Sequence, residues 1–283
     1  MTGSVWRWLI APLAVVALAL TGCASTLHHI TDSYVLGDGF GTDVCASWSP
    51  VDAHLLIADY AHEQVRLYDE NLAETLSISG MPCCRQPVAW SPDGQRIAFG
   101  DIGVTGPTRI RMVDLASGED VPMSQVVEDG YDVTWSPDGT KLALMRNRGS
   151  LSGISDAIVV DSSNLTSIAS FEFTDQVLRD VEWSPDGAYL AAISNQEIRV
   201  WITDGWMVMS GRDFRNATWT QVAWSPDSSS IVTGGWGGQT QVWNLLRLDI
   251  VHELSPNELI PNLVGNAVSW SPDGQYVISG NLD

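Results

Sequence analysis

The chain has 283 residues and a formal net charge of −20, with 34 acidic residues against 14 basic ones. A surface this acidic repels nucleic-acid phosphate, which argues against DNA or RNA as a partner. The length is ample for a single packed domain. The simplest explanation of the acidic surface is solubility or a saline habitat.

The first 23 residues predict an export signal. One basic residue, Arg7, precedes the apolar run Leu9–Leu20, which is too short to span a bilayer comfortably and has the length of a signal-peptide core. The run ends in Leu20-Thr21-Gly22-Cys23, which resembles the lipobox of bacterial lipoproteins. The resemblance implies removal of residues 1–22, acylation of Cys23 with chains such as palmitate, and firm anchoring of the chain in a membrane. The alternative is an ordinary signal peptide with a chance cysteine.

Residues 23–42 form the predicted lipidated amino-terminus. The stretch Ser25–Gly41 is polar and contains glycine, with one strand-like run at Tyr34-Val35-Leu36. It is interpreted either as a tether or as a strand that closes the ring described next, and both interpretations can hold together. Asp38 and Asp43 flank glycine-rich backbone, but two carboxylates are too few to predict a calcium site.

Residues 43–283 carry a repeat that predicts a β-propeller. The motif Trp-Ser-Pro returns at intervals of 41 to 48 residues, at Trp48, Trp90, Trp135, Trp183, Trp224 and Trp270. Proline presets the φ angle of a tight turn, aspartate follows, and glycine accepts the positive φ that closes it. A period in the forties with strands inside each unit is typical of propeller blades.

Each repeat contains short apolar runs that read as strands. Arg96-Ile97-Ala98-Phe99 follows one turn directly, and Ile110-Arg111-Met112-Val113 lies further along the same repeat. Weaker strands follow, as in Ser167–Phe173 and Met207–Ser210. Two turns depart from the pattern, because Asp52 is displaced by one position and Ser228 replaces the glycine.

These turns and strands resemble TolB-like and related WD-like propeller repeats. The endings Arg199-Val200-Trp201 and Gln241-Val242-Trp243-Asn244 look more like WD repeats proper. The Gly-His pair of WD repeats is missing, and Gly238 stands where their turn aspartate is expected. The hydrogen-bonded tetrad of WD repeats is therefore expected to be absent, and the TolB-like subgroup is the nearer resemblance.

The end of the chain raises the question of ring closure. The sequence stops at Asp283, after the second strand of the sixth repeat. The expected fold is all-β: a propeller of six four-stranded blades, with the amino-terminal segment completing the last. The alternative is a shortened relative of a larger propeller with an exposed edge.

Three cysteines follow Cys23. An exported chain lies in a compartment that permits disulfides, so a bridge from Cys45 to Cys84 or Cys83 is one interpretation and free cysteines are the other. No spacing of cysteine and histidine predicts a metal site or a cofactor.

The face opposite the Trp-Ser-Pro turns carries the longer loops, and we predict the binding site there. Arginine and tryptophan are favoured at interaction hot spots. The candidate side chains for an acidic or aromatic partner are Arg85, Arg146, Arg148, Arg212, Arg215, Trp219 and Trp236. The alternative is that these arginines solvate loops or pair with nearby carboxylates.

No catalytic motif is recognised, and the Ser-Pro-Asp-Gly serines already have a role in the turn. The sequence therefore predicts a binding scaffold rather than an enzyme, lipid-anchored outside the cytoplasm of a bacterium, with a protein or glycan partner. One alternative is a hydrolase or lyase acting at the channel mouth, which would need carboxylates and a histidine converging on the channel. Another is a truncated accessory domain without independent activity.

Overall fold

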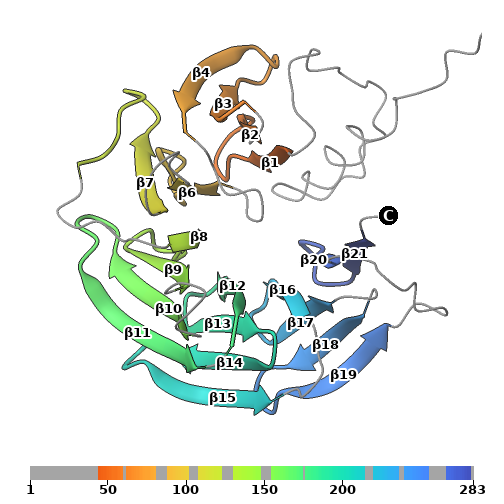
Figure 1. The fold of residues 1–283 in the computed structure, drawn as a ribbon. Helices are drawn as coiled ribbons and strands as arrows, with labels where there is room; N and C mark the ends of the chain where they lie inside the picture. The colour runs from red at the N-terminus through yellow and green to blue at the C-terminus, as the bar shows by residue number, and fades with distance from the viewer. Residues whose placement is uncertain are drawn as a thin grey trace, which may run out of the picture.

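The computed structural model describes residues 44–59, 62–80, 88–101, 108–122, 130–147, 154–174, 176–213, 219–235, 239–254 and 266–281. These residues form antiparallel sheets only, which follow one another around a ring from orange blade 1 to dark blue blade 6 (Figure 1). The predicted all-β propeller fold is confirmed. Closure of the ring by the amino-terminal segment lies outside the described residues.

Four of the sheets have four strands each, in sequence order from the channel outwards. Blade 1 contains β1 (Val44–Trp48), β2 (Leu55–Asp59), β3 (Gln64–Tyr68) and β4 (Glu74–Ser79). Blade 3 contains β8 (Gly130–Trp135), β9 (Lys141–Asn147), β10 (Ile154–Asp161) and β11 (Ser167–Thr174). Blade 4 contains β12 (Leu178–Trp183), β13 (Tyr189–Ser194), β14 (Glu197–Ile202) and β15 (Met207–Asp213). Blade 5 contains β16 (Trp219–Trp224), β17 (Ser230–Gly235), β18 (Thr240–Asn244) and β19 (Asp249–Leu254).

The other two sheets are smaller within the described residues. Blade 2 contains β5 (Ala89–Trp90), β6 (Arg96–Asp101) and β7 (Arg109–Asp114), and blade 6 contains β20 (Asn266–Trp270) and β21 (Val277–Asn281). Tyr276, just before the last strand, is 73% exposed, and Ile278, within it, is 47% exposed.

The Trp-Ser-Pro turns join the first two strands of every blade, so they lie together on one face of the ring. In five turns the serine hydroxyl donates to the aspartate two residues on at 2.5–2.6 Å, as in Ser136 to Asp138. Gly139 has a φ of +70°, and a Cβ there would lie 3.7 Å from Pro92 in the preceding turn. Each turn thus packs on its neighbour. Ser228, which replaces glycine, adopts the same backbone with a φ of 59°.

The core lies between neighbouring blades rather than in one central mass. The cluster between blades 3 and 4, for example, joins Phe173 and Val159 to Leu178 and Trp201. Side chains on alternate positions of a strand face opposite sides of its sheet. Each blade therefore buries one set of residues against the blade before it and another against the blade after it.

Three of the motif tryptophans also carry hydrogen bonds between blades. The indole N–H of Trp224 donates to the carbonyl oxygen of Glu182 in the preceding blade at 3.1 Å. Trp135 reaches Ala89 in the same way at 3.2 Å, and Trp90 reaches Ser47 at 3.4 Å. Within the third strand of blade 5, the buried indole of Trp243 donates to Thr233 at 2.9 Å.

Candidate functional site

The arginine-bearing loop face predicted from the sequence is only partly within the described residues. Arg146 lies there, at the end of β9, and its guanidinium pairs with the buried carboxylate of Asp156 on β10. This is the internal pairing that the sequence left open as the alternative. Arg212 lies in β15, where its backbone pairs with Ile198, and its side chain is not described. Arg85, Arg148, Arg215 and Trp236 lie outside the described residues.

The prediction for Trp219 was wrong. Its side chain is 2% exposed and packs edge-on against Trp243, with ring centroids 6.2 Å apart. The ring belongs to the core between blades 4 and 5, because Trp219 begins the inner strand β16 rather than standing in the preceding loop. A buried indole is not available to a partner.

The proposed cysteine bridge and the lipidation site are not tested by this structure. Cys45 lies in β1 and is partly exposed, while Cys84, Cys83 and Cys23 are outside the described residues. The described residues contain no helix long and apolar enough to cross a membrane.

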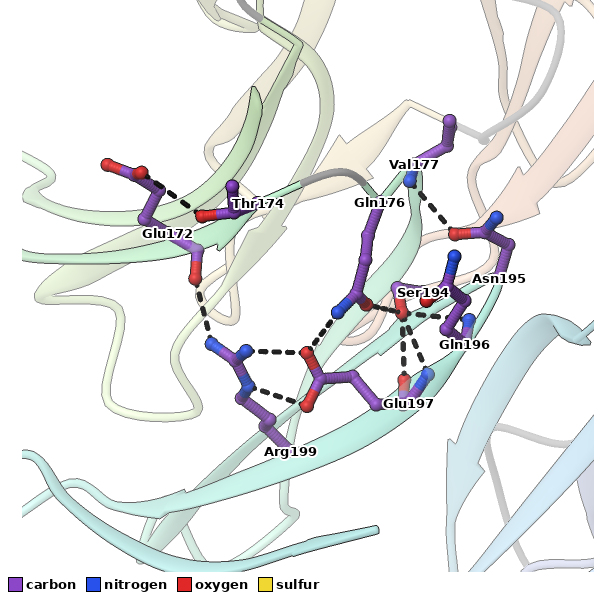
Figure 2. A network of polar contacts seen from close by, with 9 residues as sticks. All are labelled: Glu172, Thr174, Gln176, Val177, Ser194, Asn195, Gln196, Glu197 and Arg199. Carbon is purple, nitrogen blue, oxygen red and sulfur yellow. Dashed lines mark hydrogen bonds and ion pairs between the residues drawn. The ribbon is translucent and has the colours of Figure 1, made fainter. Parts of the chain in front are cut away.

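A polar network lies on the face opposite the Trp-Ser-Pro turns, where the chain passes from blade 3 to blade 4. Figure 2 shows its residues. The side-chain amide of Gln176 donates to Glu197 at 2.6 Å, and Ser194 donates to Gln176. Arg199 donates from Nε to Glu197 at 2.9 Å and from a terminal nitrogen to the Glu172 carbonyl oxygen at 2.8 Å.

The same guanidinium lies 4.3 Å from the ring centroid of Phe173, within the range of a cation–π contact. The donors and acceptors of this network are matched among the described residues themselves. We interpret it as a structural contact that holds blades 3 and 4 together, and not as a ligand site.

A cavity of about 400 Å³ lies in the channel, on the side of the turns. Its walls come from the innermost strands β1, β5, β8 and β12 and from the turn prolines Pro50 and Pro92. The chemically distinctive lining residues are three tryptophans and three acids: Trp48, Trp90, Trp135, Asp132, Asp180 and Glu182. No lysine, arginine or histidine stands among the described residues of this lining. This cavity is our candidate functional site.

The position three residues before the motif tryptophan determines how the inner strands are joined. At this position Gln221 accepts a hydrogen bond from the Val268 amide of the next blade at 3.0 Å. Asp180 does the same with the Val222 amide at 2.8 Å, through Oδ2. Its other oxygen, Oδ1, accepts from its own neighbour Val181, also at 2.8 Å.

Asp132 occupies the same position in blade 3 with a different outcome. Its Oδ1 accepts from the Val133 amide at 2.7 Å. By the pattern above, its Oδ2 would take the amide of Val181, but that amide already donates to Asp180. Within the described part of the chain, no donor reaches this buried oxygen. Two aspartates at the same position of successive repeats thus compete for one backbone amide.

Burial raises the pKa of Asp132 well above its ordinary value, and both the negative charge of Asp180 and a hydrogen bond between the two carboxyl groups raise it further. The pKa of Glu182 is also raised well above its ordinary value, by burial first and then by the charges of Asp180 and Asp132. The cause is the same for both groups, because a low-dielectric channel penalises several like charges held close together.

The cavity does not have the ligand arrangement of a metal site. In the described ranges, no three histidine, cysteine or carboxylate side chains are placed to hold one metal ion. The volume also exceeds what a bare ion would fill. The site therefore favours a larger ligand.

The sequence analysis missed this cavity because it looked for function in the loops. A signal was present: Asp132 and Asp180 stand at the same place in repeats whose other copies carry Cys45, Pro87, Gln221 and Ala267. Only two neighbouring repeats carry a charged residue at this inner-strand position, and this pattern marks the channel as a candidate site. The carboxylates required by the enzyme alternative are therefore present, whereas a histidine is absent from the described lining.

The comparisons with known proteins agree with the fold. The family model described as "WD domain, G-beta repeat" matches residues 165–201, 214–244 and 261–283, which confirms the resemblance to WD repeats in those segments. A search of curated proteins gave no match.

Three solved structures illustrate the likeness. A chain of the Kuenenia stuttgartiensis hydrazine synthase structure is 18% identical over 84% of this chain and 82% of its own, with a TM-score of 0.63. A chain of a mitotic checkpoint complex is 16% identical over 83% and 70%, with a TM-score of 0.64. The Myceliophteria thermophila Cps50 (Swd1) β-propeller domain is 12% identical over 84% and 78%, with a TM-score of 0.66. At these identities the likeness establishes the fold alone: the chain is a β-propeller.

Proposed function

We propose that the protein is a membrane-anchored, extracytoplasmic propeller that acts as a non-catalytic scaffold for a partner protein. The observation that carries this proposal is the channel cavity, which offers buried carboxylates and indoles on the turn face of a rigid ring. A rigid frame with a concave site of apolar walls and a few polar groups is the usual form of a binding site. The WD40-type repeats support the same reading, because repeat propellers present broad interaction faces.

The anchoring rests on the sequence. Leu20-Thr21-Gly22-Cys23 supplies the thiol and the small residues that lipoprotein processing needs. The test is to express the full chain in a bacterium with radiolabelled palmitate and to separate membrane from soluble fractions. We expect label in the membrane fraction, lost in Cys23→Ala but retained in Cys45→Ala. Equal labelling of Cys23→Ala and the parent chain would refute the anchor.

The scaffold role is tested by site-specific cross-linking in the envelope of the source cells. A photoreactive amino acid at Thr134, which lines the cavity, is compared with one at Met207, which is 62% exposed on the outer strand β15. We expect a discrete adduct with one protein from position 134 and none from position 207. Absence of an adduct from position 134 would count against a protein partner at the cavity. A protein-free adduct that is lost after glycosidase treatment would assign a glycan instead.

One observation favours a second candidate, a hydrolase. Paired acids with separated environments are the means by which enzymes obtain a general acid and a base. The raised pKa of Asp132 and of Glu182 would suit a proton donor. The test is a panel of chromogenic glycosides and esters: turnover by the parent chain that Asp132→Asn and Glu182→Gln both abolish would establish an enzyme.

A further inference from the structure

One position of the repeat, the residue just before the motif tryptophan, contributes to the lining of the channel cavity in four blades. The residues at this position are Ser47, Ala89, Thr134, Glu182, Ala223 and Ser269. The first four border the cavity, and each is partly exposed. Glu182 is the one long side chain in this set, so the small residues of blades 1 to 3 leave room for a ligand beside it.

Three of these side chains carry polar groups that the protein does not use. Ser47 and Glu182 accept hydrogen bonds from neighbouring indoles, but only through their backbone carbonyl oxygens. Among the described residues, no hydrogen bond or ion pair engages the hydroxyl groups of Ser47 and Thr134 or the carboxyl group of Glu182. Two hydroxyl groups and one carboxyl group at the cavity are therefore available to a ligand.

The other two acids of the lining already have structural contacts. Asp180 accepts hydrogen bonds from the amides of Val181 and Val222, and a further hydrogen bond joins it to the carboxyl group of Asp132. Asp132 also accepts from the amide of Val133. We therefore assign the ligand contacts to Glu182 and the hydroxyl groups, and not to these two aspartates.

The environment of Glu182 favours its neutral form. Burial raises the pKa of this carboxyl group well above its ordinary value, and the charges of Asp180 and Asp132 raise it further. A neutral carboxylic acid both donates and accepts hydrogen bonds, as a hydroxyl group does. No basic side chain stands among the described residues of the lining to bind an anion. The available groups therefore match an uncharged ligand that carries several hydroxyl groups.

The walls of the cavity suit the carbon skeleton of such a ligand. Trp48, Trp90 and Trp135 border the same space, and indole rings offer large, flat apolar surfaces. A sugar ring has a face of C–H groups that packs on a flat surface, with hydroxyl groups around its edge. The cavity volume of about 400 Å³ falls within the range of roughly 300–1,000 Å³ that is usual for small-molecule sites.

We propose that the channel cavity binds an uncharged saccharide, whose hydroxyl groups bond to Ser47, Thr134 and Glu182 and whose ring packs on the tryptophans. The inference rests on the proposed function, since it gives the scaffold's binding site its ligand chemistry. The saccharide has two sources with the same chemistry: a glycan carried by the partner protein, or a free saccharide.

The experiment is a calorimetric titration of the full chain in a detergent without a sugar head group. The probes are the methyl glycosides of glucose, galactose, mannose, fucose and N-acetylglucosamine. Cyclohexanol is the comparison with one hydroxyl group, and n-butylamine is the cationic one. We expect saturable binding of at least one glycoside and none of cyclohexanol or n-butylamine.

Three variants test the assigned contacts. Thr134→Val removes one hydroxyl group and nearly keeps the shape of the side chain, whereas Glu182→Ala removes the carboxyl group. Each is expected to weaken binding about tenfold, the factor that corresponds to the loss of one good hydrogen bond. Glu182→Gln keeps a donor and an acceptor at the same place, so binding should stay within about threefold of the parent chain. Thr166→Val, at an exposed threonine just before β11, is the matched control and should change nothing.

The outcomes separate the inference from the proposed function. If no glycoside binds, or if Thr134→Val and Glu182→Ala bind as the parent chain does, the saccharide site is refuted, whereas a protein cross-linked from position 134 would still support the scaffold. An equal loss in Glu182→Gln and Glu182→Ala would also refute it, because the site would then need a charge.

The source of the saccharide is decided with the cross-linked partner. If this protein binds the parent chain before but not after glycosidase treatment, the saccharide is carried by the partner. If the treatment makes no difference, or if no protein is cross-linked while the glycosides bind with the expected losses, the inference stands with a free saccharide as the ligand.

Discussion

The carboxylate of Asp180 accepts a hydrogen bond from the backbone amide of Val222 at 2.8 Å and so joins the inner strands of blades 4 and 5. Because Asp180 also takes the amide of Val181, the corresponding oxygen of Asp132 is left without a donor. Asp180 thus adds a hydrogen bond between blades 4 and 5. The equivalent hydrogen bond between blades 3 and 4, from the Val181 amide to Asp132, is not formed. The pKa of Asp132 is raised in part by a hydrogen bond to Asp180, so the two carboxyl groups act as a pair in the channel.

Asp132→Asn is expected to stabilise the empty protein at pH 8. The folded state raises the pKa of Asp132, so it penalises the charged form, and that penalty grows as the pH rises from the unfolded value near 4 through the folded value. Removal of the charge should raise the melting temperature by about 2 to 4 °C for each kcal/mol recovered. Thermal melts at pH 8 and pH 4 check this, because the gain should vanish at pH 4. An equal loss at both values would contradict the assigned burial cost.

The turn aspartates should give the opposite dependence on pH. Burial alone would raise the pKa of Asp138, but hydrogen bonds from Ser136 and Thr140 outweigh it and lower the pKa to about 2. The stability that such a group contributes is complete above the unfolded pKa near 4 and is lost as the pH falls through about 2. Asp138→Asn should therefore lower the melting temperature at pH 7 more than at pH 2.5. Asp204→Asn is the control, and a constant difference across this range would refute the linkage.

Trp224→Phe tests the indole bonds between blades. The Nε1 of Trp224 donates to the carbonyl oxygen of Glu182, whereas the Nε1 of Trp183, at the same repeat position, is buried without a partner in the described residues. Both substitutions remove similar apolar area, since the two side chains are 6% and 7% exposed. We expect Trp224→Phe to cost about 1 kcal/mol more than Trp183→Phe in denaturant unfolding. Equal costs would show that the bond adds nothing net.

Arg199→Ala should loosen the junction of blades 3 and 4. The substitution removes the bond to the Glu172 carbonyl oxygen, the pairing with Glu197 and the contact with Phe173. A loss of about 1 to 2 kcal/mol is expected, at the lower end of the range for charged hydrogen bonds because the side chain is 27% exposed. Arg109→Ala, at an exposed position of β7, is the control. Hydrogen exchange should speed up in β11 and β14, and unchanged exchange there would contradict the role of Arg199.

Deletion of residues 25–41 tests ring closure. Tyr276 and Ile278 leave apolar surface exposed in blade 6, and a strand from the amino-terminal segment would cover it. We expect the deletion to lower the melting temperature and to remove amide protection from β21. An unchanged melting temperature after the deletion would show that the segment is a tether.

The repeat made most of the fold predictable because its information is local. The proline, aspartate and glycine of one turn determine that turn by themselves, so even Gly139 and Pro137 could be placed from sequence. Packing between turns tolerates one exception, because Ser228 adopts the positive φ of the glycine that it replaces.

The site could not be predicted in the same way. Whether Asp132 has a donor depends on which residue already uses the amide of Val181 in the next blade, 49 residues further on. The error at Trp219 has the same origin, because this residue begins the inner strand β16 and packs against the neighbouring blade instead of lying in a loop. Contacts between blades are not encoded within one repeat.

The indole bonds between blades end on backbone carbonyl oxygens, those of Ser47, Ala89 and Glu182. The side chains at these positions are therefore not needed for that bond, and they differ in size and charge from blade to blade. Substitution at these positions therefore changes the lining of the channel but preserves the hydrogen bonds between blades. Ligand preference in this architecture can thus diverge by single substitutions at one position of each repeat, which makes the channel a practical place to install new recognition by design.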